Sequence, residues 1–362
     1  MARESIRREI ESSLKELMDR HHVPMLRDGC GWWSKGFGLA DVESQRPVTS
    51  ETVFNVGSIS KTVAAWGVMV LVEQDSVHLD DRVEDYLTRW HLPPTHFDLE
   101  LVTIRRCLSH TAGLSLHGYP GFPPGVELPT LEESLSGNTN GAGEVSVTLR
   151  PGTQWRYSGG GYTLVQLAME EVSGMKFAEL IRKEVLEPLK MKNSDYLWSE
   201  LVDELAATPY DENGKPIPGP RFTEAAAAGL QTSLDDFVRF AEASLPRYRK
   251  SEDPKILAVE SIEEMQRPCS PARSYGLGYS IERHGSVAVV GHGGTNFGWQ
   301  ARLEVVPATG DGLIVLTNAS GGGSVIDALS GRWKAWLRRT YAQQPGAAPS
   351  EENSKDSDGA RR

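Results

Sequence analysis

The chain has 362 residues, enough for one large domain or two interlocked ones. Hydrophobic residues make up 39% and charged residues 24% of it, as in ordinary globular proteins. The formal net charge of -11 argues against nucleic acid or an anionic membrane surface as a partner. Apolar runs stay shorter than a bilayer requires, so we expect no membrane-spanning helix.

The N-terminal segment and the metal-binding residue types limit the function further. The segment from residue 1 to 20 is charged throughout and lacks the apolar centre of a secretion signal, which predicts a cytoplasmic protein. Three isolated cysteines, Cys30, Cys107 and Cys269, fit a reducing compartment. The nine histidines have no spacing typical of metal ligands. We therefore expect neither a metal nor another cofactor.

The first half of the chain predicts mainly helices and loops. Apolar residues recur at helical spacing over about residues 3 to 20, which predicts an amphipathic helix. Residues 31 to 40 read as a strand with bends that glycine permits. Residues 103 to 114 predict a helix closed by Gly113. Residues 115 to 130 are rich in proline and glycine, and we expect them to form a lid or a pocket wall.

The second half predicts further helices and then a meander of strands. We expect helices over about 161 to 173, 176 to 187 and 225 to 244, the last with Ser233 as a plausible N-cap inside it. Residues 276 to 319 read as consecutive short strands separated by turn residues, which predicts an antiparallel meander. A last helix, about 325 to 341, precedes a polar tail, 343 to 362, whose composition predicts disorder.

This order of elements predicts the fold class. Strands near both ends, with helical segments between them, indicate an α/β (α+β) fold with an antiparallel sheet flanked by helices. Residues 1–80 and 225–342 would form the sheet domain, and residues 81–224 an inserted helical domain. We expect the functional site in the cleft between the two domains.

Ser58 and Lys61 lie where a polar turn runs directly into the uncharged segment 62 to 72. An apolar run of that length predicts a helix buried on nearly all sides. Residues three apart share a helix face, so the Lys61 amine can reach the Ser58 hydroxyl. The first turn of a helix also offers unpaired N–H groups and the positive end of its dipole. We interpret the pair as a candidate activated nucleophile.

Two further segments carry candidate site residues. Tyr157 follows a Pro-Gly turn and precedes three glycines, so it is either a core tyrosine or a phenol that relays the Ser58 proton. Gly293 and Gly294 would let a substrate approach a strand backbone whose N–H groups bind an oxyanion. His292 beside them is either a hairpin histidine or a substrate-binding group, which would become charged below a pH of about 6.5.

Four segments in this order resemble the serine β-lactamase and penicillin-binding-protein superfamily. The similarity is to its class C-like branch, which includes D-aminopeptidases, DD-peptidases and β-lactamase-like carboxylesterases. It extends over about residues 3 to 341, and the segments are SISK at 58 to 61, LSHTAGL at 108 to 114, PGTQWRYSGGGY at 151 to 162 and GHGGTNFGW at 291 to 299.

The resemblance implies an acyl-enzyme mechanism. Ser58 would attack an ester or amide carbonyl, with Lys61 and Tyr157 as the shared base and acid. The N–H groups of Ser58 and Thr295 would form the oxyanion hole. His110 in the LSHTAGL segment is expected to be structural and to satisfy loop carbonyls.

The chain departs from the family pattern at three places. The family's Y-x-N motif reads Tyr157-Ser158-Gly159, and its K-T-G strand reads His292-Gly293-Gly294. These changes remove an amide and a fixed positive charge, which favours small, neutral acyl donors. The third departure is near the N-terminus, where the residues from 25 to 31 leave room for only a short first strand.

We therefore expect a cytoplasmic serine hydrolase of small carboxylic esters, with weak β-lactam hydrolysis as a further activity. One alternative is a D-aminopeptidase, a DD-peptidase or a β-lactamase. Another is an inactive binding module that kept the fold. The expected partner is a small-molecule ester or amide substrate, and the sequence does not predict an oligomeric state.

Overall fold

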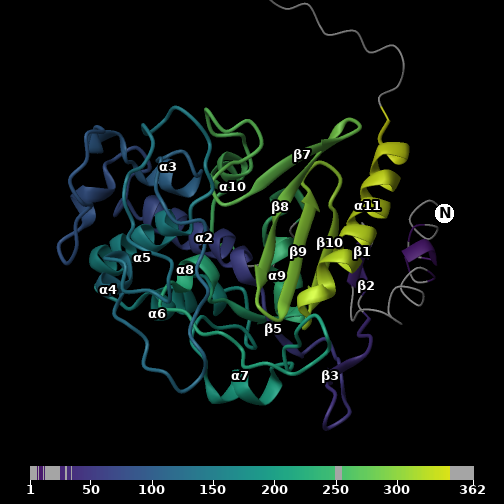
Figure 1. Cartoon of the computed structure of the whole chain (residues 1–362). Coiled ribbons are helices and arrows are strands. Elements are labelled where there is room, and N and C mark those ends of the chain that lie inside the picture. Colours follow the sequence, from purple (N-terminus) through teal and green to yellow (C-terminus); the bar gives the residue numbers. More distant parts are fainter. Residues whose placement is uncertain are drawn as a thin grey trace, which may run out of the picture.

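A six-stranded antiparallel sheet forms one side of the molecule, and helices pack against both of its faces (Figure 1). The computed structural model describes residues 6, 8–10, 12, 25–28, 31–33, 35–248 and 255–342. Most of the helix expected over residues 3 to 20, and the expected disordered tail, lie outside these residues. Within them, no helix is long and apolar enough to cross a membrane.

The predicted meander is confirmed. Its strands are β7 (Ser280–His284), β8 (Val287–Asn296), β9 (Trp299–Val306) and β10 (Asp311–Thr317), each antiparallel to the next. Successive residues of β10 face opposite sides of the sheet, and both sides are buried: Ile314 packs into the inner core and Leu313 into the outer one. This is why β10 reads as a continuous apolar run instead of an alternating one.

The N-terminal segment adds two short strands to this sheet. The strand order is β2-β1-β10-β9-β8-β7, with β1 (Met25–Asp28) between β10 and the edge strand β2 (Gly31–Trp33). The sheet is therefore built from both ends of the chain, as predicted. The first strand is short, as its sequence indicated: its described residues pair with Gly312–Ile314 of β10 and with β2. The strand expected over 31 to 40 is wrong in extent, because Leu39–Asp41 forms β3 and pairs with β4 (Arg46–Pro47) instead.

The last helix, α11 (Gly323–Thr340), covers the outer face of the sheet, close to its predicted bounds. Its apolar side contacts the outward-facing residues of β8 and β10. Ile6 and Ile10, both buried, belong to the same cluster, so the described N-terminal residues lie against this face as well.

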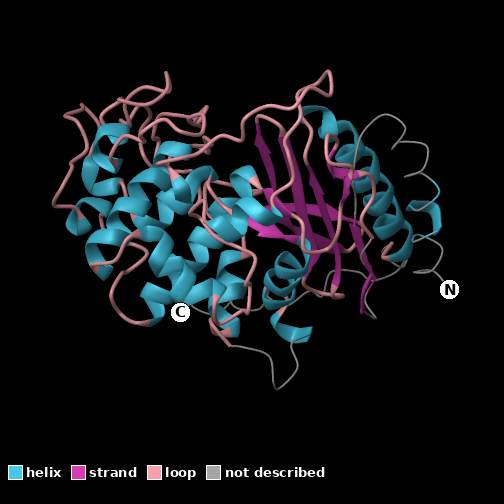
Figure 2. Ribbon diagram, turned by 90° about the horizontal axis from the view of Figure 1, so that it is seen from below, coloured by secondary structure: helices cyan, strands magenta, loops and turns pink. Residues whose placement is uncertain are grey.

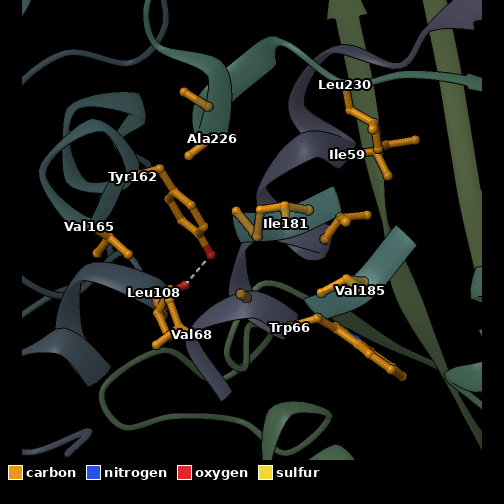
Figure 3. Close-up of a cluster of buried hydrophobic side chains, with 14 of the residues drawn as sticks. Ile59, Trp66, Val68, Leu108, Tyr162, Val165, Ile181, Val185, Ala226 and Leu230 are labelled. Atoms are coloured by element: carbon orange, nitrogen blue, oxygen red, sulfur yellow. Dashed lines mark hydrogen bonds between the residues drawn. The ribbon is translucent and has the colours of Figure 1, made fainter. Parts of the chain in front are cut away.

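The inner face packs against the buried helix α2 (Ser60–Glu73), which lies between the sheet and the helical region (Figure 1). Residues Ser60 to Leu71 of α2 are all buried, as the uncharged sequence predicted. One continuous apolar core joins the two regions around it (Figure 3). In that core Ile59 lies beside Leu230, and the Tyr162 hydroxyl donates to the Leu108 carbonyl at 2.9 Å.

The helical region (Figure 2) contains several short helices around one longer helix, α5 (Gly159–Ser173). Its helices and short turns are α3 (Ile104–Leu108), α4 (Leu131–Leu135), α6 (Phe177–Ile181) with a π-helical turn at Arg182–Leu186, and α7 (Glu200–Leu205). Ser158 caps α5 by accepting from the Gly161 N–H. The expected domain bounds at residues 80 and 224 stay a prediction.

Two expected helices are wrong in extent. The segment 225 to 244 is α8 (Ala225–Ala228), strand β6 (Gln231–Ser233) and α9 (Leu234–Ala243), because β6 pairs with β5 (Val53–Asn55) just before the Ser58 turn. Ser233 does cap α9, by accepting from the Asp236 N–H. The helix expected to end at Gly113 ends at Leu108 instead, because His110 has a φ of 60° and turns the chain.

Candidate active site

Ser58 stands at the entrance to the buried helix α2. It belongs to a single 3₁₀ turn, Gly57–Ile59, that continues directly into α2. The side chain of Ser58 is half-buried, whereas its neighbours Gly57 and Ile59 are buried. N–H groups in the first turn of a helix lack intrahelical partners and lie at the positive end of its dipole. Negative charge that develops at Ser58 is therefore stabilised by its position.

Lys61 lies next to Ser58 and is almost completely buried, with 1% of its surface exposed. Its Nζ donates to the Ser58 Oγ at 3.2 Å and to the Ala227 carbonyl at 2.6 Å. No described carboxylate lies within ion-pair distance of it. Because burial disfavours the charged amine, the pKa of Lys61 falls from 10.5 to about 7. A neutral amine that can accept the Ser58 proton is therefore available near neutral pH.

Tyr157 completes the group of three predicted catalytic residues. The ring centroid of Tyr157 lies 5.0 Å from the Lys61 Nζ. Its hydroxyl is buried beside Ser58 and, within the described residues, makes no hydrogen bond of good geometry. Burial raises the pKa of Tyr157, and the Ser58 hydroxyl lowers it by less. The phenol is therefore protonated at neutral pH and can serve as a proton donor.

These three side chains open into a cavity of about 660 Å³ at the junction of the sheet and the helical region. Three segments form its walls: the loop at residues 117–119, the helix α8 and the end of strand β8. The residues that line it are Ser58, Lys61, His117, Gly118, Tyr119, Tyr157, Ala227, Ala228, His292, Gly293, Thr295 and Asn296. The expected pocket wall within residues 115 to 130 is thus present at residues 117–119.

The end of strand β8 borders this cavity with an open backbone edge. Strand β7 pairs with β8 only as far as Gly291. In the described part of the chain, residues His292 to Asn296 have a neighbouring strand on one side only, which is β9. Their backbone groups on the other side are available to a substrate.

Glycines bring this strand into backbone contact with the Ser58 turn. A Cβ atom on Gly294 would lie 1.8 Å from the Val56 carbonyl oxygen, and one on Gly57 would lie 2.6 Å from the Thr295 nitrogen. Gly57 also has a φ of 51°, which glycine adopts without strain. Gly294 therefore lets the turn approach the strand, and it is not among the residues that line the cavity. Gly293 lines the cavity with its backbone, and a Cβ atom at this position would point toward the Arg302 side chain.

Two asparagines that the sequence reasoning missed hold the same junction together. The Asn296 Nδ2 donates to the Asn55 Oδ1 at 2.6 Å and to the Ala228 carbonyl at 3.1 Å. The Asn55 Oδ1 also accepts from the Gly57 N–H at 2.9 Å. Strands β5 and β8 and helix α8 therefore meet through one polar network at the base of the Ser58 turn. Isolated asparagines gave no sequence signal, because their partners are far away in the chain.

Comparison with known proteins agrees with this arrangement. The family model described as Beta-lactamase matches residues 13–334. The chain belongs to the beta-lactamase family. The resemblance inferred from the four motifs is thereby confirmed.

The relatives that resemble this chain are named for different hydrolytic activities. The chain is 24% identical over 330 residues to the unguisins hydrolase ungD' of Aspergillus campestris, which covers 85% of this chain and 60% of that protein. It is 25% identical over 311 residues to the D-aminopeptidase of Brucella anthropi, covering 84% and 57%. It is 28% identical over 213 residues to the esterase EstB of Burkholderia gladioli, covering 56% and 53%. The chain thus spans between 53% and 60% of the length of these relatives.

A solved structure of the same fold supports the architecture. The octameric penicillin-binding protein homologue from Pyrococcus abyssi superposes with a TM-score of 0.71 at 28% identity, covering 89% of this chain and 77% of that one. The predicted fold class, an antiparallel sheet flanked by helices in the β-lactamase arrangement, is confirmed.

Gly159 stands where the family's Y-x-N motif has asparagine, and a loop packs against this glycine. A Cβ atom on Gly159 would lie 3.1 Å from the His117 carbonyl oxygen and 3.3 Å from both Gly118 and the Tyr119 ring. The Gly159 N–H donates to the Leu116 carbonyl at 2.8 Å. The loop thus fills the space beside this glycine.

At the second departure, His292 faces the cavity but is not the titrating group that the sequence suggested. Its Nδ1 donates to the Gly293 carbonyl, and its Nε2 is buried. Burial, together with the charge of Lys61, lowers the pKa of His292 to about 3. The expectation that His292 becomes charged below about pH 6.5 is therefore wrong, because the ring lies inside the protein and not at an exposed hairpin.

Three other aromatic residues of the motifs, Trp155, Phe297 and Trp299, are not among the residues that line the cavity. Trp299 is buried and packs edge-on against Phe54, with ring centroids 6.0 Å apart. Phe297 is 60% exposed and Trp155 is 45% exposed. Trp155 lies against Tyr275 and Tyr157 outside the cavity wall.

A methyl group at Gly294 should disrupt the site, because it would collide with the Val56 carbonyl and displace strand β8 from the Ser58 turn. We expect Gly294→Ala to lower the rate of Ser58 acylation by about 100-fold, the usual effect of a small misplacement of catalytic groups. Gly293→Ala is the matched control, since its methyl group would lie 3.6 Å from the flexible Arg302 side chain. Labelling by a fluorophosphonate measures both variants. Equal losses would contradict this role of Gly294.

The pH dependence should follow the protonation of Lys61. The base is active when neutral, and its pKa in the folded protein is about 7. Below that pH the acylation rate constant should fall by about tenfold per pH unit, and above it the rate should level off. Stopped-flow measurement of kcat/KM for a neutral ester between pH 5.5 and 9 tests this. The fall in kcat/KM on the acidic side of the profile should correspond to the binding of about one proton. A flat profile across this range would exclude Lys61 as the base.

Proposed function

We propose that the chain is a serine hydrolase that forms an acyl-enzyme on Ser58 and acts on small, neutral carboxylic esters. The observation that carries this proposal is the buried Lys61 amine, 3.2 Å from the Ser58 hydroxyl and without a described acidic partner. A lysine held in this way serves no structural ion pair, and a base beside a hydroxyl is the requirement for nucleophilic catalysis. Relatives named as an esterase and a D-aminopeptidase support hydrolysis as the reaction class.

In the proposed acylation step, the Ser58 oxygen attacks the carbonyl carbon of the ester. The Ser58 proton passes to the neutral Lys61 amine. The negative charge that develops on the carbonyl oxygen is bound by the N–H groups of Ser58 and Thr295, which backbone contact at Gly57 holds close together. When the C–O bond breaks, the leaving alkoxide takes a proton from Tyr157, and the proton on Lys61 replaces it.

Deacylation repeats the sequence with water as the nucleophile. Water gives its proton to the neutral Lys61 amine and attacks the acyl carbon. The Ser58 oxygen then leaves with a proton from Tyr157, and the proton on Lys61 replaces it. The raised pKa of Tyr157 suits the role of acid, because a protonated phenol can donate to the leaving group. The lowered pKa of Lys61 suits the role of base.

The chemistry of the cavity favours neutral acyl donors. Lys61 is the only residue with an ordinarily cationic side chain among the described residues that line it, and none of them is acidic. His292 is neutral at any physiological pH, so a substrate carboxylate would meet no fixed positive charge there. The loop packed on Gly159, whose residues 117–119 line the cavity, also fills the space beside this glycine. The proposed partner is therefore a small ester or a related amide, and a cytoplasmic location stays a prediction.

A panel of acyl donors tests the proposal. Wild type should hydrolyse p-nitrophenyl acetate and butyrate faster than nitrocefin or D-alanyl p-nitroanilide. Ser58→Ala should lose at least about 10,000-fold in turnover, because the nucleophile itself is removed. Mass spectrometry should find one fluorophosphonate adduct on wild type and none on Ser58→Ala. Preference for the D-alanyl substrate would indicate a peptidase, and no adduct on either protein would indicate a binding module.

The protonation state of His292 gives a separate prediction. Its pKa of about 3 means that it stays neutral between pH 5 and 8. The KM for p-nitrophenyl hemisuccinate, divided by that for the neutral butyrate, should therefore change with pH in the same way in wild type and in His292→Asn. This comparison removes the contribution of Lys61, which titrates in both proteins. An inflection near pH 6.5 that occurs in wild type alone would mean that His292 carries charge.

A further inference from the structure

His110 lies beneath the site in a conformation that few side chains adopt. It follows α3 with a φ of 60°, and 1% of its surface is exposed. A residue other than glycine in the left-handed region is uncommon, and such strain is retained where the surrounding contacts require it. The contacts of His110 show what the conformation achieves. They differ from the loop carbonyls that the sequence reasoning expected it to satisfy.

His110 holds the residues on both sides of Tyr157. Its carbonyl oxygen accepts from the Arg156 N–H at 2.8 Å. Its ring Nδ1 accepts from the Ser158 N–H at 3.1 Å, so the neutral ring carries its hydrogen on Nε2. Because the chain turns at His110, the carbonyl and the ring of this residue both face the segment 156–158. Both N–H groups that flank the tyrosine are therefore fixed by a single residue.

The His110 ring also packs on the tyrosine itself. The ring centroids of His110 and Tyr157 are 4.2 Å apart, with 40° between the ring planes. On its other side Tyr157 contacts the His117 ring, at 4.8 Å between centroids. Since the Tyr157 hydroxyl has no hydrogen bond of good geometry to the described residues, ring packing and the two backbone bonds determine where it lies.

We propose that His110 is a positioning residue that fixes the Tyr157 phenol against Lys61 and Ser58. The proposal rests on the serine hydrolase function above, in which Tyr157 gives a proton to the leaving group. His110 does not touch the substrate, because the ring and carbonyl face the segment 156–158 and not the cavity. In the proposed mechanism it acts through Tyr157, the catalytic side chain on which its ring packs.

The conservative replacement follows from the geometry. Asparagine tolerates a positive φ better than most residues, and its Oδ1 can take the place of the histidine Nδ1 as an acceptor for the Ser158 N–H. His110→Asn should therefore keep most of the activity. Glutamine places its acceptor one bond further away, and alanine has none, so both should lose the position of the phenol.

A double-mutant cycle separates positioning from general stability. We expect His110→Ala to lower the rate constant of Ser58 acylation by about 10- to 100-fold. The same change should have little further effect in a Tyr157→Phe background, because the group that it positions is already missing. Ser109→Ala is the matched control: it removes one buried hydrogen bond to Thr111 in the same turn but contacts neither neighbour of Tyr157. Equal losses from His110→Ala in both backgrounds, or an unchanged rate, would overturn the proposal.

Two further measurements keep the test decisive. The thermal unfolding midpoint shows whether His110→Ala folds. If it does not fold, His110→Asn and His110→Gln are compared instead, and we expect activity in His110→Asn only. Equal activity in these two variants would overturn the proposal. If wild type shows no Ser58-dependent turnover, the proposed hydrolase function fails, and crystal structures then decide the question of position. The distance of 5.0 Å between the Tyr157 ring and Lys61 should persist in His110→Asn and be lost in the alanine or glutamine variant. An unmoved ring in that variant would show that His110 does not position it.

Discussion

The constraint on which the rest of the site depends is the burial of one lysine, which has no ion-pair partner among the residues that the structure describes. The Lys61 amine is removed from water and bonds to the Ala227 carbonyl and the Ser58 hydroxyl, and neither group neutralises its charge. Between pH 7 and 10.5 the folded state therefore binds fewer protons than the unfolded state, and stability rises with pH over this interval. At neutral pH the protein is destabilised by this residue. Such a cost is typical of residues kept for their chemistry.

The architecture around this lysine brings three distant parts of the chain to one point. The helix that carries Lys61 begins at the sheet, α8 supplies the carbonyl that holds the amine, and the segment before α5 supplies the phenol. Glycines at 57 and 294 allow direct backbone contact, and the Asn55 and Asn296 side chains bond across the junction. Because each contact joins elements that are remote in sequence, none of the three parts could form the site alone.

The cavity also explains how one fold can serve different acyl donors. The groups that carry out the proposed reaction are held by buried contacts, including the hydrogen bonds of His110 to the neighbours of Tyr157. The residues that would contact the acyl group lie instead on the loop at 117–119 and at the open edge of β8. Changes there alter which substrate fits without changing the nucleophile or its base.

The sequence by itself determined the local features: the buried helix after Ser58, the meander from β7 to β10, and the candidate nucleophile with its lysine one turn away. These follow from apolar periodicity and short spacing, which are local signals. Only the tertiary structure decided that 225 to 244 breaks into two helices around β6, that Gly294 serves packing, and that His292 is uncharged. Strand pairing, backbone contact and desolvation depend on partners far away in the chain, and for that reason no local pattern could predict them.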